Sequence, residues 1–157
     1  MARTSAGVLL HRRAADGGVE VLIGHMGGPF WAKKDDGAWS IPKGEYDDGQ
    51  DPRAVACREF EEELGAPVPT SDLVALGDVR AGGKVLTMWA AEGDLDAEAC
   101  RSNTFLLEWP PRSGRMQEFP EMDRAAWVPI DVARQKLVKG QLPFLDRLLT
   151  RIDGSVT

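Results

Sequence analysis

Three glutamates within five consecutive residues are the side chains of this sequence best placed to do chemistry. Glu59, Glu62 and Glu63 stand at positions i, i+3 and i+4 of one short stretch. In a helix this spacing puts all three carboxylates on one face. Like charges so close together repel, and Mg²⁺ is a hard cation that prefers carboxylate oxygens together with substrate phosphates. From these residues alone, a solvated helix face and a metal site both remain open.

The flanking residues predict the helix that this spacing requires. Asp51 is a good N-cap, and Pro52 suits the first helical position. Gly65 can adopt the left-handed conformation that ends a helix, and Pro67 follows just beyond it. We therefore expect a helix from Pro52 to Gly65. Its apolar face is predicted to consist of Ala56, Cys57, Phe60 and Leu64.

The segment 44–66 resembles the signature of the Nudix hydrolases. In that pattern a Gly is followed after five residues by Glu. After seven more come Arg-Glu, an apolar residue, any residue, Glu-Glu, any residue, Gly and an apolar residue. The matching positions here are Gly44, Arg58, Glu59, Phe60, Glu62, Glu63, Gly65 and Ala66. One position departs from the pattern, because Gln50 replaces the first glutamate and cannot contribute a full charge.

The resemblance implies an enzyme that adds water to a phosphorus atom of a nucleoside diphosphate derivative, such as a nucleoside triphosphate or a dinucleoside polyphosphate. It implies Mg²⁺ or Mn²⁺ as cofactor, because divalent ions neutralise the diphosphate and acidify the attacking water. The implied metal ligands are Glu59, Glu62, Glu63 and, from a later loop, Glu121, with Glu118 as the second choice for that loop position. The implied catalytic set is Glu62, Glu63 and Arg58. Either glutamate can be the general base, whereas Arg58 orients the carboxylates by pairing with them.

Basic and aromatic residues near the signature predict how a nucleotide would be held. The predicted substrate-binding residues are Lys43, Gly44, Trp31, Lys33 and Lys34, and further candidates are Arg112, Arg115, Phe30 and Trp39. Basic side chains bind phosphate, and aromatic rings stack on nucleobases. The alternative is that Trp39 belongs to the core and the lysines are only solvated. The segment 39–44 is similar to that of the diadenosine polyphosphate hydrolases of this family, but it does not assign the substrate.

Short β-rich runs and turn residues predict the rest of the chain. Strands are expected over 5–10, 19–25, 38–41, 73–79, 84–92 and 125–128, and further helices over 130–138 and 143–152. Residues 42–44 are expected to end a strand, 26–37 to form a loop, and 97–122 to be irregular around Pro110 and Pro111. The fold that the resemblance implies is α/β, a Nudix-type α/β/α sandwich with a mixed, partly antiparallel sheet. The 157 residues are expected to form one domain, 1–157.

The composition limits the partners. With 19 Lys and Arg against 25 Asp and Glu, the formal net charge is -6, which disfavours bulk nucleic-acid binding while leaving room for a local phosphate-binding patch. We expect a cytoplasmic protein that acts on a small nucleotide, because the chain has neither a signal peptide nor an apolar stretch long enough to span a membrane. Cys57 and Cys100 are expected to be reduced. A monomer and a homodimer both remain open.

Two other functions compete with the hydrolase. The first is a non-catalytic Nudix-like module that binds a nucleotide metabolite, which normally has a damaged carboxylate cluster or an attached DNA-binding domain. Glu59, Glu62 and Glu63 are intact, and 157 residues are not expected to hold a DNA-binding domain beside this one. The second is an isomerase on the same fold that acts on an isoprenoid diphosphate. It would require a reactive cysteine in the pocket, whereas Cys57 is expected to be inert packing on the apolar face of the helix.

Overall fold

The computed structural model describes residues 3–154 of the chain. Its elements in order are β1 (Arg3–Arg13), β2 (Val19–Met26), β3 (Trp39–Ser40), β4 (Lys43–Glu45), α1 (Pro52–Leu64), β5 (Leu73–Ala81), β6 (Lys84–Glu92), the 3-10 turn η1 (Ala97–Ala99), β7 (Thr104–Glu108), β8 (Met116–Pro120), β9 (Met122–Pro129), α2 (Ile130–Lys136), the 3-10 turn η2 (Lys139–Gln141) and α3 (Leu142–Gly154). The helices and strands predicted from the sequence are all present, with ends that differ by a few residues.

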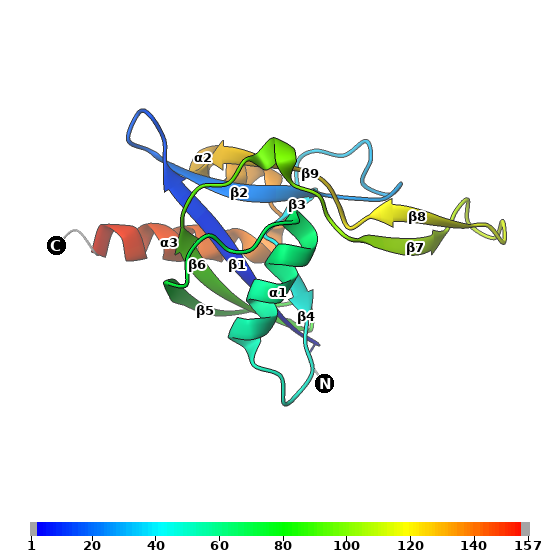
Figure 1. Ribbon diagram of the computed structural model, residues 1–157, viewed down its shortest axis with the longest axis horizontal. Coiled ribbons are helices and arrows are strands. Elements are labelled where there is room, and N and C mark those ends of the chain that lie inside the picture. The colour runs from blue at the N-terminus through cyan, green and yellow to red at the C-terminus, as the bar shows by residue number, and fades with distance from the viewer. Residues whose placement is uncertain (1–2, 155–157) are drawn as a thin grey trace.

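The central sheet is organised around β1, which crosses the middle of the molecule (Figure 1). The strand pairs in parallel with β6 along nearly its whole length. It pairs antiparallel with β2 near its C-terminal end and with β4 near its N-terminal end. The other edges are β5 beside β6, and β3 and β9 beside β2. The sheet is therefore mixed and mostly antiparallel, as expected.

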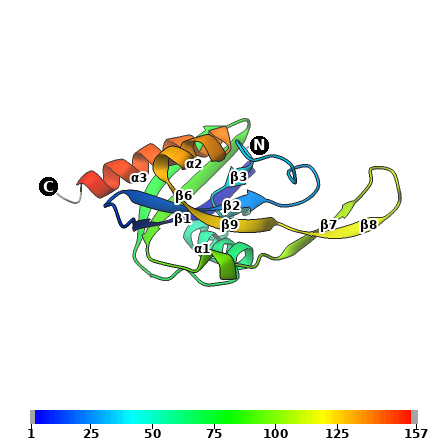
Figure 2. The same ribbon diagram turned by 90° about the horizontal axis from the view of Figure 1, so that it is seen from above.

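Helices cover both faces of this sheet, which makes the predicted α/β/α sandwich. Figure 2 shows α1 on one side, and α2 and α3 on the other. On the α1 side, Phe60 and Leu64 pack against residues of the sheet such as Leu10. On the opposite side, Phe144 and Leu148 of α3 pack against Leu9 and its neighbours. Since successive residues of β1 face opposite sides, this one strand contributes to both cores.

Two features differ from the expectation. The strand expected over 38–41 does stop before residues 42–44, since β3 ends at Ser40, but Lys43–Glu45 then form a further strand, β4, which pairs with β1 in the register Ala6↔Gly44. Within the segment expected to be irregular, β7 and β8 form an antiparallel hairpin that projects from the body of the molecule (Figures 1 and 2). A half-buried strand is recognised in a sequence by apolar residues that alternate with polar ones. This pattern is missing in β7, because Leu106 points outward and is 66% exposed although it is apolar.

Neither cysteine is in a disulfide, in agreement with the expectation. Burial raises the pKa of the Cys57 thiol, so this thiol stays protonated and is a poor nucleophile. No helix within residues 3–154 is long and apolar enough to cross a membrane.

Candidate active site

Helix α1 presents the three glutamates as the spacing predicts. The side chain of Asp51 accepts a hydrogen bond from the Arg53 N–H and caps the first turn. Gly65, at φ 75°, ends the helix in the left-handed conformation, where its N–H donates to the carbonyl of Glu61. Burial of Phe60 and Leu64 against the sheet fixes the rotation of the helix. The carboxylates of Glu59 and Glu63 consequently lie along the border between the helix and β4, whereas much of the Glu62 side chain is exposed.

The carboxyl group of Glu63 is the most strongly desolvated of the three. Its Oε2 accepts a hydrogen bond from the backbone N–H of Lys43 at 3.3 Å. Burial raises the pKa of Glu63 to about 8, and the negative charges of Glu59 and Glu121 raise it further, while Lys43 opposes the shift. Without a cation beside it, this glutamate is therefore protonated at neutral pH.

Glu59 packs directly on the backbone of β4. A Cβ atom added at Gly44 would lie 2.1 Å from the Glu59 carboxyl carbon, so only glycine leaves space for this side chain. Glycine is thus required at position 44 because the Glu59 side chain lies so close to the backbone, and not because the chain makes a tight turn there. The pKa of Glu59 is raised by burial and by the charge of Glu62, with Glu121 adding to the shift.

Arg58 contacts two of the three carboxylates. Its Nη2 lies 3.4 Å from Glu59 Oε1, and its Nε lies 3.9 Å from Glu62 Oε1. Half of the Arg58 side chain is exposed, as is much of the Glu62 side chain, so these are contacts at the edge of the cluster. Within residues 3–154 Arg58 makes no hydrogen bond or ion pair to Glu63, so the deepest carboxylate has no arginine partner there.

Glu121 reaches the helix through a set of backbone hydrogen bonds. The N–H groups of Arg101 and Asn103 donate to the free carbonyls of Leu64 and Glu62 at the end of α1. The Asn103 carbonyl in turn accepts the N–H of Glu121 at 2.9 Å. The charge of Glu121 acts on both Glu59 and Glu63. Glu118, the second choice, instead accepts a hydrogen bond from the Thr104 hydroxyl on the hairpin.

These carboxylates are near one another but do not yet form a coordination shell. Among residues 3–154, no group of three acidic, histidine or cysteine side chains is close enough to hold one metal ion. The donor set is nevertheless composed of carboxylate oxygens, which suits Mg²⁺. The shared metal site stays a prediction.

Gln50, which replaces the first glutamate of the signature, stabilises a turn. Its side-chain Oε1 accepts a hydrogen bond from the backbone N–H of Asp47 at 2.8 Å, and its backbone N–H donates to the Asp47 carbonyl at 3.1 Å. A neutral amide oxygen is sufficient for this bond. The substitution therefore keeps the turn that precedes α1.

The structure separates the predicted substrate-binding residues into two groups. Lys43 and Gly44 lie at the carboxylate cluster. Trp31, Lys33 and Lys34 lie instead in the loop between β2 and β3, where Trp31 is partly buried against the core and the Lys34 ammonium lies 5.3 Å from the centre of its ring. Trp39 is only 4% exposed, so its role as a core residue is the one that the structure supports.

A buried histidine that the sequence did not single out anchors this loop. Nε2 of His25 donates to the Lys34 carbonyl at 2.6 Å, and Nδ1 is hydrogen-bonded to the Asp123 carboxylate at 2.9 Å. His25 has no exposed surface. Its only signal in the sequence is its place at the end of a predicted strand, which is insufficient to identify a loop anchor.

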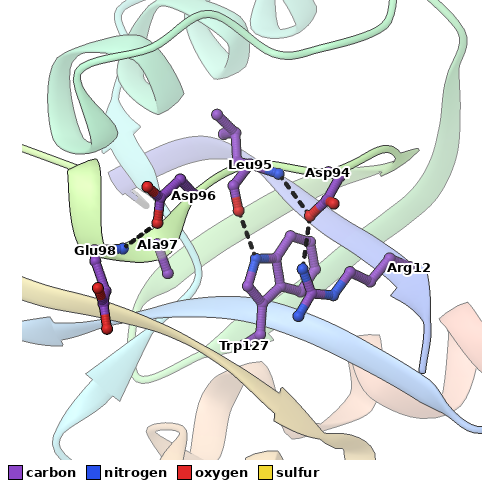
Figure 3. A pocket seen from close by; sticks show the side chains of 7 residues that line it. All are labelled: Arg12, Asp94, Leu95, Asp96, Ala97, Glu98 and Trp127. Carbon is purple, nitrogen blue, oxygen red and sulfur yellow. Dashed lines mark hydrogen bonds and ion pairs between the residues drawn. The ribbon is translucent and has the colours of Figure 1, made fainter. Parts of the chain in front are cut away.

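A separate cavity of about 510 Å³ lies between the end of β1, η1 and β9. Its polar groups bond mainly to one another (Figure 3). Arg12 lies 4.1 Å from the centre of the Trp127 ring and pairs with Asp94, while Trp127 Nε1 donates to the Leu95 carbonyl. None of the residues predicted for catalysis lines this cavity.

Comparisons with known proteins agree on one family. Residues 1–148 match the family described as NUDIX domain. The chain is 26% identical over 142 residues to an RNA pyrophosphohydrolase of Rhodospirillum rubrum, which covers 85% of this chain and 84% of that protein. An Ap4A hydrolase of C. elegans has a similar fold, with a TM-score of 0.62, 21% identity and coverage of 97% of this chain and 98% of that one. The NUDIX domain of Shewanella oneidensis NrtR in complex with ADP ribose gives a TM-score of 0.64 at 17% identity, covering 97% and 89%.

We predict that Gly44→Ala impairs activity while barely affecting stability. The new Cβ would meet only the flexible end of Glu59, so the side chain moves and the backbone does not. Displacing a reacting group by about 1 Å costs roughly 100-fold in rate. In a Glu59→Ala background the same change should have no further effect on turnover. An equal additional loss in that background would show that Gly44 acts through something other than Glu59.

The raised pKa of Glu63 predicts how the metal-free protein responds to pH. The folded state binds this proton more tightly than the unfolded chain, so the stabilisation is complete below pH 4.5 and is lost as pH rises through about 8. In a chelating buffer we expect the free energy of unfolding to fall by up to about 1.4 kcal/mol per pH unit from this group between pH 5.5 and 7.5. Denaturant titrations should show a shallower fall for Glu63→Gln. Parallel curves for the two proteins would contradict the assignment.

Proposed function

We propose that this chain, which belongs to the NUDIX domain family, cleaves the pyrophosphate linkage of a nucleoside diphosphate derivative with Mg²⁺ or Mn²⁺ held by α1. The family assignment confirms the resemblance found in the segment 44–66. The candidate substrates are nucleoside triphosphates, dinucleoside polyphosphates and related compounds.

The observation that carries this proposal is the partly desolvated carboxylate cluster. Burial and mutual repulsion raise the pKa values of Glu59 and Glu63. Such a cluster is unfavourable in its charged form unless a cation compensates it. Glu59, Glu62, Glu63 and Glu121 would hold the metal, since hard divalent ions favour oxygen ligands and keep positions for water and phosphate.

A divalent ion held there supplies positive charge for the diphosphate and lowers the pKa of the attacking water. The protein's own residues divide the remaining tasks. Glu62 or Glu63 accepts the proton of the water as general base. Arg58 keeps Glu59 and Glu62 in place from the edge of the cluster, and the N–H of Lys43 orients Glu63.

Two relatives suggest the kind of nucleotide. One is an RNA pyrophosphohydrolase, and another is an Ap4A hydrolase. Trp31, Lys33 and Lys34 in the loop between β2 and β3 are the proposed contacts for the nucleotide beyond the reacting phosphates. The competing proposal is a module that binds a nucleotide without cleaving it, and the NUDIX domain of NrtR binds ADP ribose. The intact set of glutamates favours the hydrolase.

We predict that millimolar Mg²⁺ raises the melting temperature of the protein. A ligand at 100 times its dissociation constant stabilises the folded state by about 2.7 kcal/mol, which corresponds to roughly 5–10 °C for a chain of this size. Thermal melts with Mg²⁺ and with chelator measure the shift, and Glu63→Gln should reduce it. An unchanged melting curve would count against a preformed metal site.

Turnover of a substrate panel tests the function itself. Nucleoside triphosphates, dinucleoside polyphosphates, nucleotide sugars and dinucleotide cofactors would be assayed for phosphate release with Mg²⁺ or Mn²⁺ and a coupled phosphatase. We expect Glu63→Gln to lose at least about 100-fold in kcat. Glu61→Gln is the matched control, because Glu61 lies in the same helical turn but is exposed. Metal binding without turnover of any substrate would favour the binding module.

A further inference from the structure

The hairpin formed by β7 and β8 is the part of the fold that the reaction as described does not use. It pairs in the register Phe105↔Phe119 and extends away from the central sheet (Figures 1 and 2). A two-stranded hairpin is only marginally stable in water by itself. Its extension from the body therefore calls for a function.

One face of this hairpin carries aromatic residues near both of its ends, with Leu107 and Gln117 paired between them. Phe105 and Phe119 form a cross-strand pair with ring centres 6.1 Å apart. Four residues beyond Phe105, Trp109 continues the same face, and its N–H donates to the Arg115 carbonyl at 2.9 Å. Phe30, which is 63% exposed, contacts the Trp109 ring edge-on at 5.6 Å. We call Phe30, Phe105, Trp109 and Arg115, together with Arg112 at the tip, the hairpin face.

The cations at the tip of the hairpin are available to a ligand. Arg112 and Arg115 are exposed. Neither guanidinium has an ion-pair partner in the part of the chain that the structure describes. The turn that carries them is nevertheless held in place, because the Arg112 N–H donates to Glu108 and the Gln117 amide donates to the Trp109 carbonyl.

The hairpin face begins at the carboxylate cluster. Strand β8 ends at Pro120, and Glu121 follows immediately. At about 3.3 Å per residue, Arg115 lies about 20 Å from Glu121 along the strand. One nucleotide whose phosphates lie at the cluster cannot extend that far. A longer chain of nucleotides can.

We propose that the hairpin face binds the first nucleotides of a single-stranded RNA whose 5′-polyphosphate lies at the carboxylate cluster. This inference rests on the proposed function, and it names the substrate class. Aromatic rings stack on bases whatever their sequence, and arginines contact the phosphates between them. The net charge of -6 confines such binding to this local surface. A second copy of the chain would instead be expected on the opposite face, where Leu106 and Met116 are exposed.

Binding of RNA without cleavage tests the surface independently of catalysis. The probe is a single-stranded RNA octanucleotide with a 5′-hydroxyl end, measured by fluorescence anisotropy in chelator. We expect Trp109→Ala to weaken binding about 10-fold. Arg112→Gln combined with Arg115→Gln, which removes no internal bond, should reduce the slope of log K against log salt by about 1.4. Leu106→Ala, on the opposite face, is the matched control and should leave both quantities unchanged.

Turnover of 5′-triphosphorylated RNA of one, two, four and eight nucleotides then tests the length dependence. We expect KM to fall as the RNA lengthens, and the double arginine variant to lose this fall while keeping its kcat on the mononucleotide. Equal KM values at all lengths, or equal RNA binding by all variants, would overturn the proposal. So would a concentration-dependent dimer that is lost in the Trp109→Ala variant. RNA binding through the hairpin face with no turnover of any RNA or of any nucleotide in the substrate panel would retain the surface and contradict the proposed hydrolase function.

Discussion

The organisation of the site depends on one electrostatic constraint, which is that carboxylates are held close together and partly out of water. Holding these negative charges together costs free energy, and their place in the helix adds to that cost. The glutamates lie in the last two turns of α1, where the helix dipole disfavours negative charge. The nearby backbone offsets part of that cost. Gly44 leaves space for the Glu59 carboxylate, and the Lys43 N–H donates to Glu63. The rest of the cost, from burial first and from the charges of Glu59 and Glu121 second, raises the pKa of Glu63, and a bound cation would relieve it.

The way α1 ends connects this helix to the rest of the acidic cluster. A helix leaves its last carbonyls without partners, and buried carbonyls must be satisfied. Here the segment 101–103 supplies the donors to Glu62 and Leu64, and its own carbonyl at Asn103 then fixes Glu121. The same hydrogen bonds therefore complete the helix and bring a fourth carboxylate near the other three. A shift of this segment would disturb both.

The sequence predicted the helix, its caps and the order of the strands because local rules decide them. Asp51 and Gly65 act through their own backbone conformations, and apolar periodicity fixed the face that Phe60 buries. The misjudged parts depend on distant contacts. Lys43 belongs to a strand only because β1 lies beside it, and the role of Gly44 depends on a side chain fifteen residues further along the chain. The hairpin was missed because much of its apolar surface faces solvent and not a core, so its pattern does not distinguish an inside from an outside.

Separation of opposite charges explains how an acidic protein can attract an anionic substrate. The charge of Lys43 already opposes the raised pKa of Glu63, and a further lysine or arginine inside the cluster would compete with a metal ion for the carboxylate oxygens. Arg58 avoids this by contacting only Glu59 and Glu62 from the edge, at 3.4 and 3.9 Å. Arg112 and Arg115, which have no carboxylate partner in the described chain, stand on the projecting hairpin instead. Coulomb interactions between exposed charges are screened beyond about 10 Å. Cations farther than this from the carboxylate cluster can therefore attract phosphates without weakening the negative charge that the metal requires.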